Sequence, residues 1–344
     1  MSKDNQYPEV ADHGFFPSDY HLPTQDFRAH QQFYPNKETI GTDEMLMSVL
    51  GTPFLGPPRR EHVTCDLCGA DDPFFLFEKE GFSYIRCNRC SLVYVTPRLR
   101  DHSQQQGKFY RDETGGDYEA AAEQDRRPRR MKSLIKMARS YLTYRRIGAL
   151  LDVGCGFGAF LDAAKSVGWK VCGLEVASAP ASIAARCHDV FNGYLSDTPY
   201  GSDSFDVVRL NSVIEHVSSP RALVRDIGRV LRPGGLLHIS TPNVKSFSMV
   251  LQGAGWRYVC GQHHIYLFSP RTLARLMESE GFKIVRVSTR GIHFNHKNRR
   301  LGAHPLFLRK VTQQGVTYVE KLLNLALQKT LRGHRLRVWA ERVA

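Results

Sequence analysis

The sequence has no run of about 18 apolar residues, so we expect no transmembrane helix. The first residues, Met1–Asn5, are polar and lack the apolar core of a secretory signal peptide. Cytoplasmic residence is therefore the expectation. Acidic residues are also scarce relative to basic ones, with 34 Asp and Glu against 47 Lys and Arg among 344 residues. The length is sufficient for one large domain and a smaller one.

The formal net charge of +13 is unevenly placed. Nine basic and no acidic residues occupy positions 126–146, and thirteen basic residues stand against Glu320 and Glu341 from Arg286 onward. Such stretches fit an anionic partner, such as a phosphate-bearing small molecule, an anionic membrane surface or a nucleic acid. A solvated basic face without a partner is the structural alternative.

Four of the eight cysteines form a C-x2-C-x18-C-x2-C array: Cys65, Cys68, Cys87 and Cys90. Two such pairs on tight turns can bring four thiolates onto one Zn²⁺ ion. Four thiolates leave no open coordination position, so this metal is predicted to be structural. The aromatic segments 74–77 and 82–86 between the pairs predict strands of a small zinc ribbon. Two disulfides are the alternative, which a reducing compartment disfavours.

A short apolar strand ending at Val153 leads into the glycines 154, 156 and 158, and then into a helix predicted over 159–167. Glycines allow a sharp turn and close approach of a ligand to the backbone, and the helix N-terminus favours an anionic or polar group. The pattern also fits the dinucleotide-binding fingerprint. Glu175 closes the next predicted strand, where a carboxylate can accept hydrogen bonds from the ribose of an adenosine cofactor.

Strand and helix patterns alternate from residue 147 onward, which predicts an α/β fold with a mostly parallel sheet and helices on both faces. The predicted strands are 150–153, 170–175, 189–194, 205–210, 236–240, 283–287 and 335–341, and the predicted helices after the first are 220–231, 270–280 and 316–331. The domain prediction is an extended N-terminal segment (1–60), a zinc ribbon (61–97), a basic helical connector (98–146) and the α/β domain (147–344), with an inserted helical segment near 300–331.

Several short motifs occur in a fixed order along the α/β domain. They are Asp152–Gly158, Ser204–Val208, Ile214–Val217, Leu231–Gly235 and Ser240–Asn243. With these motifs, and with the segment 263–270, the chain resembles the class I S-adenosylmethionine-dependent methyltransferases, in particular the small-molecule branch with a Glu-His motif. The ribbon resembles the module of members that methylate sugars or related metabolites.

The resemblance implies a Rossmann-like seven-stranded sheet with the last strand antiparallel, and S-adenosylmethionine as cofactor. It implies that Asp152 and the glycine turn bind the methionine part and that Glu175 holds the ribose. Family members often carry an acidic residue near the end of the third strand to bind the adenine amine; this chain has Tyr194 there, so stacking of adenine on Tyr194 and bonding to the backbone are the alternatives. The full set of implied cofactor-binding residues is Asp152, Gly154, Cys155, Gly156, Gly158, Glu175, Tyr194 and Asn211.

His216 is the candidate general base for the acceptor, because imidazole titrates near neutrality, and Glu215 is a candidate to orient it. Of His263, His264 and Tyr266, one or two are expected to line the acceptor pocket, with His264 as the further catalytic candidate. A structural role for each of these histidines is the alternative.

The predicted reaction is methyl transfer to an oxygen or carbon of a small, sugar- or glycan-related, anionic metabolite. An RNA methyltransferase is the main alternative, since the charge and the ribbon would suit it. Against it, 211–214 reads Asn-Ser-Val-Ile and lacks the Asn-Pro-Pro-aromatic run used on base amines. A non-catalytic cofactor-binding subunit is the second alternative.

Overall fold

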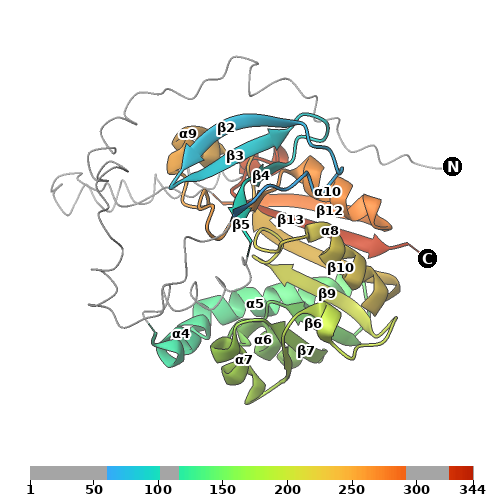
Figure 1. Ribbon diagram of the computed structural model, residues 1–344. Coiled ribbons are helices and arrows are strands. Elements are labelled where there is room, and N and C mark those ends of the chain that lie inside the picture. The colour runs from blue at the N-terminus through green and yellow to red at the C-terminus, as the bar shows by residue number, and fades with distance from the viewer. Residues whose placement is uncertain (1–59, 101–115, 292–324, 344) are drawn as a thin grey trace. The chain divides into compact units, whose positions relative to one another are not determined.

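The computed structural model describes residues 60–100, 116–291 and 325–343 (Figure 1). The predicted N-terminal segment and nearly all of the insertion near 300–331 lie outside these residues. The described residues form one compact unit. No helix of the described ranges is long and apolar enough to cross a membrane.

The larger sheet has seven strands in the order β12-β13-β10-β9-β6-β7-β8. All neighbouring pairs from β10 to β8 are parallel, whereas β13 is antiparallel to both of its neighbours. The predicted α/β class and the antiparallel last strand are therefore confirmed. The strands are β6 (Ala149–Val153), β7 (Lys170–Glu175), β8 (Asp189–Asn192), β9 (Phe205–Asn211), β10 (Leu231–Pro242), β12 (Phe282–Arg290) and β13 (Arg335–Arg342).

The helices begin and end at residues whose chemistry explains the boundary. Ser219 and Ser269 each accept a backbone N–H at the start of a helix that has proline as its first residue. Gly168 ends a helix in the left-handed conformation, at a φ of +107°. The helices are α4 (Tyr118–Asp125), α5 (Pro128–Ser140), α6 (Ala159–Val167), α7 (Ser178–Ala185), α8 (Pro220–Val230), α9 (Phe247–Gln252) and α10 (Pro270–Ser279), and residues 325–329 are also helical.

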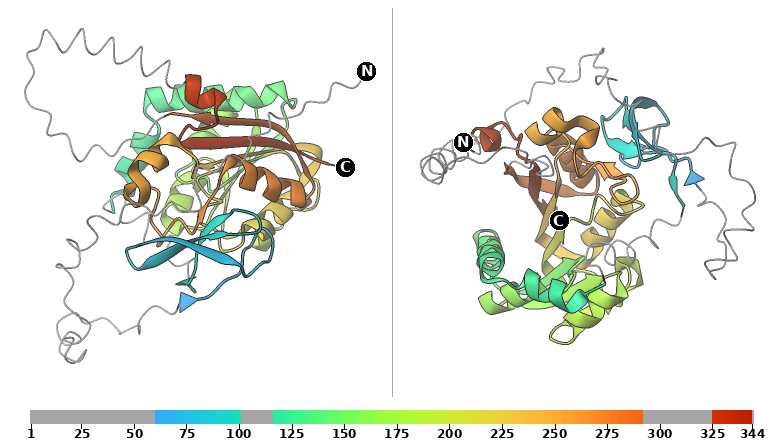
Figure 2. Two further views of the ribbon diagram at one scale, coloured as in Figure 1. Left: turned by 90° about the horizontal axis from the view of Figure 1, so that it is seen from above. Right: turned by 90° about the vertical axis from the view of Figure 1, so that its left-hand side faces the viewer.

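Both faces of the sheet are buried. Leu150 and Val207 pack with residues of α5 and α6, whereas their chain neighbours Leu151 and Val208 point to the opposite face by strand alternation. These four side chains have no exposed area. The views in Figure 2 show helices on both sides of the strands. A parallel sheet with two covered faces needs such continuous apolar strands.

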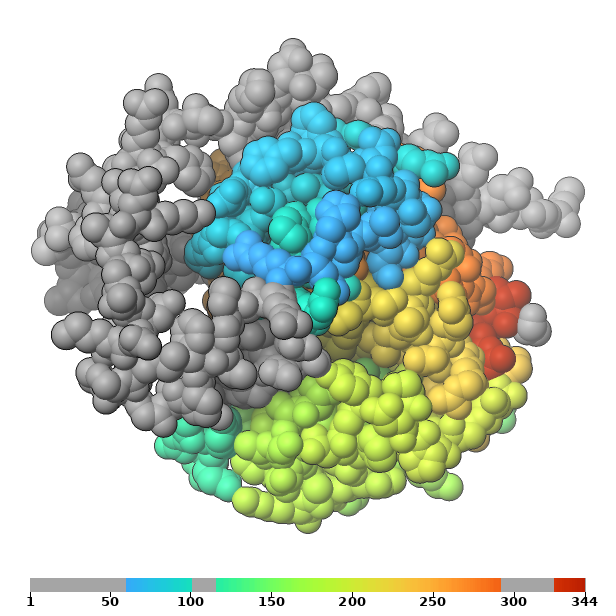
Figure 3. Space-filling view, viewed as in Figure 1, coloured from blue at the N-terminus to red at the C-terminus, as the bar shows by residue number. Residues whose placement is uncertain are grey.

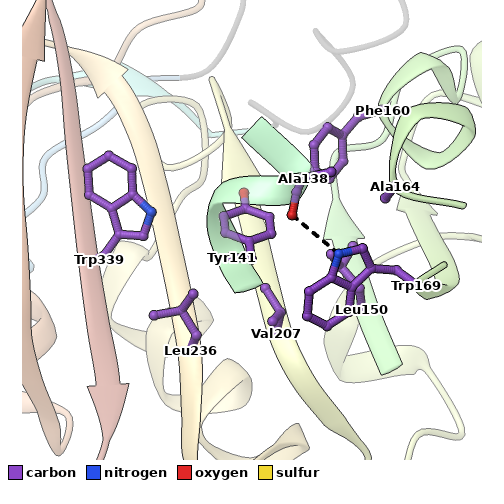
Figure 4. Close-up of a cluster of buried hydrophobic side chains, with 9 residues drawn as sticks. All are labelled: Ala138, Tyr141, Leu150, Phe160, Ala164, Trp169, Val207, Leu236 and Trp339. Carbon is purple, nitrogen blue, oxygen red and sulfur yellow. Dashed lines mark hydrogen bonds between the residues drawn. The ribbon is translucent and has the colours of Figure 1, made fainter. Parts of the chain in front are cut away.

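One apolar cluster joins α5 to the sheet (Figure 4). Tyr141 packs edge-on against Phe160 and Trp169, and its hydroxyl lies 2.8 Å from His238 Nδ1. The indole N–H of Trp169 donates to the Ala138 carbonyl at 3.3 Å. The segment 128–141, which we interpreted as a connector, thus supplies core residues to the α/β domain.

The four-cysteine module forms a second sheet, with the order β11-β4-β3-β2. Three strands come from the ribbon: β2 (Pro73–Lys79), β3 (Phe82–Cys87) and β4 (Val93–Val95). The fourth, β11 (Tyr266–Leu267), comes from the α/β domain and pairs antiparallel with β4. A short pair of β1 (Arg60–Glu61) and β5 (Arg98–Leu99) lies beside it. In Figure 3 the ribbon lies against the 215–235 stretch.

The structure differs from the predicted boundaries at β10. This strand begins at Leu231, directly after α8, and bulges before Leu236, whereas the sequence pattern predicted that 232–235 ends the helix and that the strand begins at 236. Gly234 takes a φ of +71° within this bulge. A bulge inserts residues without ending the strand, so the Pro-Gly-Gly run marks an irregular strand.

Candidate functional site

A cavity of about 640 Å³ opens at the carboxyl ends of β6, β7 and β9. This edge is where open α/β sheets bind ligands. One end of the cavity is lined by Gly154, Glu175, Tyr194 and Asn211, and the other by Glu215, His216, His263 and His264. The structure therefore brings four of the eight predicted cofactor residues to one cavity with the predicted acceptor residues. The other four, Asp152, Cys155, Gly156 and Gly158, do not line it.

The conformation of the glycine turn allows a ligand to approach its backbone closely. Gly154, Gly156 and Gly158 all have positive φ, at +71°, +54° and +82°. A Cβ added to Gly154 would lie 2.4 Å from Val213 Cγ2, so a side chain there collides with the loop after β9. Gly158 is the N-cap of α6 and provides no side-chain cap, so other groups must satisfy the first N–H groups of that helix. These features fit the methionine part of S-adenosylmethionine.

Glu175 is buried and already holds the backbone of the turn. Its Oε2 accepts the Gly156 N–H at 2.9 Å, and its Oε1 accepts the Ala177 N–H at 3.0 Å. A carboxylate has about four lone-pair sites, so each oxygen can accept a further hydrogen bond from a ribose hydroxyl. The residue thus connects the glycine turn to the place predicted for the ribose.

Asp152 lies behind the turn and does not line the cavity. Its Oδ1 pairs with Arg209 Nη1 on β9 at 2.5 Å, and the Arg209 guanidinium lies 3.9 Å from the centre of the Phe160 ring. Burial raises the pKa of Asp152 to about 6, and Arg209 opposes that shift. The observed geometry makes Asp152 a partner of Arg209 on the neighbouring strand and not a wall of the cavity.

Cys155 and Tyr194 differ sharply in exposure. Cys155 is buried in a small cluster with Leu161 and Ala184, where burial raises the pKa of its thiol. Tyr194 is 45% exposed at the cavity mouth, two residues beyond the end of β8. Its ring is therefore accessible for stacking on a planar base.

Glu215 is 1% exposed and sits between the sheet and the segment 263–266. Its Oε2 accepts a hydrogen bond from Thr241 Oγ1 at 2.9 Å, whereas Oε1 has no hydrogen-bond partner among the described residues. Burial raises the pKa of this carboxyl group. Its backbone carbonyl accepts the N–H groups of Ile265 and Tyr266, which fixes the segment that carries His264.

His216 and His264 lie with their ring centres 4.7 Å apart. Nδ1 of His216 is 2.9 Å from the His263 carbonyl, and Nδ1 of His264 is 2.7 Å from the Tyr258 carbonyl. A carbonyl can only accept, so each Nδ1 carries a proton, and Nε2 is the nitrogen of each ring that can accept one. Burial lowers the pKa of His264 to about 3, so this imidazole is neutral at neutral pH.

The ribbon holds the wall of the cavity that carries these histidines. Besides the β4–β11 pairing, the Val95 N–H donates to the Ile265 carbonyl at 2.9 Å. Asp66, between the first two cysteines, accepts from Ser219 Oγ at 2.9 Å and from the Arg221 N–H at 2.8 Å at the start of α8. The acceptor end of the cavity is therefore fixed in part by the four-cysteine module.

The four cysteines converge as the spacing predicted. Sγ of Cys65 is 3.4 Å from that of Cys90, and Sγ of Cys68 is 3.5 Å from that of Cys87. All four sulfur atoms lie within 4.8 Å of one another, and none forms a disulfide. A hydrogen bond from Cys65 lowers the pKa of Cys90 to about 5, which is the expected behaviour of crowded thiols sharing protons. The donor set fits one tetrahedral Zn²⁺ ion.

The cavity lining includes residues that the sequence analysis did not single out, among them Arg257, Tyr258 and Arg335. Arg335 Nη1 donates to Ser212 Oγ at 2.7 Å, and the Arg257 guanidinium lies 5.5 Å from the centre of the Tyr258 ring. Arg335 stands at the first position of β13, 123 residues from Ser212. No local pattern could have indicated that contact.

The family model matches the part of the chain that follows the ribbon. A model of the family described as "Methyltransferase domain" matches residues 122–287, which lie after the ribbon. The ubiquinone biosynthesis O-methyltransferase of Aeromonas salmonicida is 31% identical over 163 residues, which is 42% of this chain and 66% of that protein. The protein of the same name from Nitrosococcus oceani is 30% identical over 168 residues, covering 44% of this chain and 69% of that protein.

Two solved structures are similar in part. A SAM-dependent methyltransferase from Archaeoglobus fulgidus gives a TM-score of 0.43 at 18% identity, covering 68% of this chain and 99% of that one. The [4+2]-cyclase SpnF gives 0.47 at 19% identity, covering 70% and 97%. The chain spans about two thirds of the length of the curated relatives that it matches. The family-model match and the 30% identity over 69% of the Nitrosococcus oceani protein show that the chain belongs to the S-adenosylmethionine-dependent methyltransferases.

Proposed function

We propose that this protein transfers the methyl group of S-adenosylmethionine to an oxygen of a small, anionic, hydroxyl-bearing acceptor. The observation that carries the proposal is the single cavity, which Gly154 and Glu175 line at one end and Glu215, His216 and His264 at the other. A methyl donor and an acceptor bound at these ends would meet inside it. We further propose that the protein acts in the cytoplasm.

S-adenosylmethionine supplies an activated methyl group on a sulfonium, so the protein mainly has to align the donor and the acceptor. Alignment of two reactants can contribute about 7–11 kcal/mol to lowering a barrier. The rigid turn after β6 and the buried Glu175 would orient the donor. Asn211, at the end of β9, lines the cavity between its two ends.

His216 is the residue best placed to take the acceptor's proton. The hydrogen bond of its Nδ1 to the His263 carbonyl leaves Nε2 as the basic nitrogen. His264 is held in the same tautomer by the Tyr258 carbonyl, and Glu215 places a carboxylate beside both rings. General-base assistance of this kind is typically worth about 10²–10⁴-fold in rate.

Two arginines favour an anionic acceptor. Arg257 and Arg335 both line the cavity, and no lysine does so among the described residues. A guanidinium binds carboxylate or phosphate oxygens in a bidentate manner. Oxygen is favoured over carbon because the curated relatives are named O-methyltransferases. A sugar- or glycan-related acceptor remains the prediction from the ribbon's resemblance.

The proposal is tested by incubating the purified, zinc-replete protein with S-adenosylmethionine and a metabolite extract of cells that lack it. Mass spectrometry should show an anionic product heavier by one methyl group, and S-adenosylhomocysteine in equal amount. Glu175→Ala provides the control for cofactor-dependent transfer. Failure of calorimetry to detect binding of either S-adenosyl compound would overturn the proposal, as would a methylated RNA recovered in place of a small molecule.

A further inference from the structure

We propose that Glu215, His216 and His264 form a second metal site, which binds a divalent ion of the zinc class through two imidazole nitrogens and one carboxylate oxygen. The site is separate from the four cysteines and faces the cavity, because all three residues line it. No described residue outside these three and the four-cysteine cluster belongs to a group with comparable convergence of potential ligand atoms.

The donor atoms are close enough for one ion. One atom from each of the three residues lies within 4.8 Å of the other two. Around a zinc ion with bonds of about 2.0–2.2 Å, tetrahedral ligand atoms lie roughly 3.5 Å apart. To bind one ion, the ligand atoms would have to approach one another by about 1 Å.

The two imidazoles are held in the orientation that metal ligands need. In metal sites the ligating histidine usually donates its other ring N–H to a carbonyl or carboxylate, which fixes the ring and its tautomer. His216 and His264 both have this partner, in the carbonyls of His263 and Tyr258. One such contact is common for a structural histidine. Two adjacent rings that are both fixed in this way, each with a ring nitrogen within 4.8 Å of a carboxylate oxygen, are the arrangement of a site.

The Glu215 carboxylate supports a cation at this site independently of the two histidines. One carboxylate oxygen is held by Thr241, while the other is fully buried and has no hydrogen-bond partner in the described residues. Leaving a buried polar atom unsatisfied costs about 1–3 kcal/mol, and more for a charged group. A cation among the three residues would satisfy that oxygen and neutralise the only carboxylate of the cluster.

Two imidazoles and one carboxylate leave at least one coordination position open, as in catalytic zinc sites. The role of the ion rests on the proposed function: the acceptor hydroxyl would occupy the open position, where a metal lowers the pKa of a bound hydroxyl. The hydroxyl proton then leaves to solvent. The C–O bond forms as the C–S bond breaks, and the electron pair stays on sulfur. His216 acts as a ligand in this arrangement, and the ion takes over the activation otherwise assigned to its Nε2.

The two sites can be distinguished by their ligands. Thiolates bound to Co²⁺ give strong sulfur-to-metal charge-transfer absorption, whereas nitrogen and oxygen ligands give only weak ligand-field bands. The full-length protein is loaded with Co²⁺, dialysed and measured by absorption and elemental analysis. We expect two cobalt ions per chain, of which one shows the thiolate bands. The paired variant Glu215→Gln with His264→Gln should lose the other ion and keep the thiolate bands.

His263→Gln is the matched control, because His263 lines the same cavity and lies outside the cluster; it should retain both ions. X-ray absorption at the zinc edge of the wild-type protein gives a test that needs no variant, with nitrogen or oxygen ligands expected on half of the zinc. One ion per chain, bound by sulfur alone, would overturn the second site. Binding of S-adenosylhomocysteine is measured on the same samples, so that loss of the metal site is distinguished from failure of the proposed function.

Discussion

The two ends of the cavity are built in different ways. The cofactor end consists of β6, the glycine turn and α6, which are consecutive in the chain, with Glu175 from the neighbouring strand. The acceptor end combines the loop after β9, the segment 257–264, the start of β13 and, behind them, a ribbon whose first cysteine lies 150 residues before Glu215. The first is a local structure, whereas the second exists only when the fold is complete.

This difference explains why one end follows the general pattern of the fold and the other is specific to this chain. Every α/β protein of this type has strand ends and a helix N-terminus to offer a cofactor. In this chain the acceptor end of the cavity depends on the pairing of β11 with β4 of the ribbon. Changes at the two ends should therefore affect different kinetic constants.

The largest expected effect is at the acceptor end. Replacing His216 by Gln should lower kcat by about 10²–10⁴-fold, because the group that assists removal of the acceptor's proton is lost. The dissociation constant of S-adenosylmethionine, measured by calorimetry, should stay within about 3-fold, because none of the cofactor-end residues is altered. Equal losses in kcat and cofactor binding would show that the two ends are not separable.

The next effect is at the cofactor end. Glu175→Ala removes a carboxylate that accepts two backbone N–H groups and is expected to hold the ribose. With about 1.5–3 kcal/mol for a hydrogen bond to a charged group, cofactor affinity should fall by roughly 10²-fold. Glu119→Ala, an exposed carboxylate outside the cavity, is the matched control. Unchanged affinity in Glu175→Ala would place the ribose elsewhere.

A smaller effect should come from the ribbon contact. Asp66→Ala removes the acceptor of the Ser219 hydroxyl and the Arg221 N–H. We expect kcat to fall about 10-fold through loosening of the acceptor wall, with zinc content and cofactor affinity unchanged, since one hydrogen bond typically contributes about 0.5–1.5 kcal/mol. Asp71→Ala, on the exposed side of the same ribbon, controls for changes within the module. A loss of zinc in Asp66→Ala would attribute the effect to ribbon folding and contradict the contact's role.

The smallest expected effect concerns His238, which lies at neither end of the cavity. His238 is buried between Tyr141 and Trp339, and burial lowers its pKa well below the ordinary 6.5. The folded protein therefore does not take up the proton that the unfolded chain binds. Above pH 6.5 the burial of neutral His238 does not lower the free energy of unfolding. Below pH 6.5 the free energy of unfolding falls with pH because of this residue, by up to about 1.4 kcal/mol per pH unit.

His238→Gln should reduce the slope of unfolding free energy against pH between about pH 6 and 4.5, measured in urea, by close to one proton. The exposed His62→Gln variant should leave that slope unchanged. A wild-type slope in His238→Gln would mean that other buried groups govern the acid sensitivity.

The sequence predicted much of the fold because the sheet's strands are short, apolar and bounded by strong signals. β7 begins at Lys170 and ends at Glu175 as expected, and α6 spans the predicted residues 159–167. β10 was longer than expected, because the Pro-Gly-Gly run forms a bulge and not a turn. The antiparallel last strand came from the family resemblance, since periodicity contains no information on strand direction.

The candidate site was predictable only where it is local. The glycine turn and Glu175 are recognisable from spacing, and His216 from its motif after β9. The contacts of Arg335 with Ser212, and of Asp66 with Ser219, join segments more than 120 residues apart and follow from tertiary packing alone. The ion pair that turns Asp152 toward Arg209 also depends on the register of two strands, which the sequence pattern does not specify.

The contact between Gly154 and Val213 has a consequence for how this chain can evolve. Val213 fills the volume that a side chain at position 154 would need. A residue as large as valine fits at 213 only because position 154 is glycine. A side chain at position 154 therefore requires a residue smaller than valine at position 213. Even then the φ of +71° restricts position 154 to residues that tolerate left-handed backbone, chiefly asparagine and aspartate. The glycine turn at the cofactor end therefore limits which substitutions the loop after β9 can combine with a side chain at position 154.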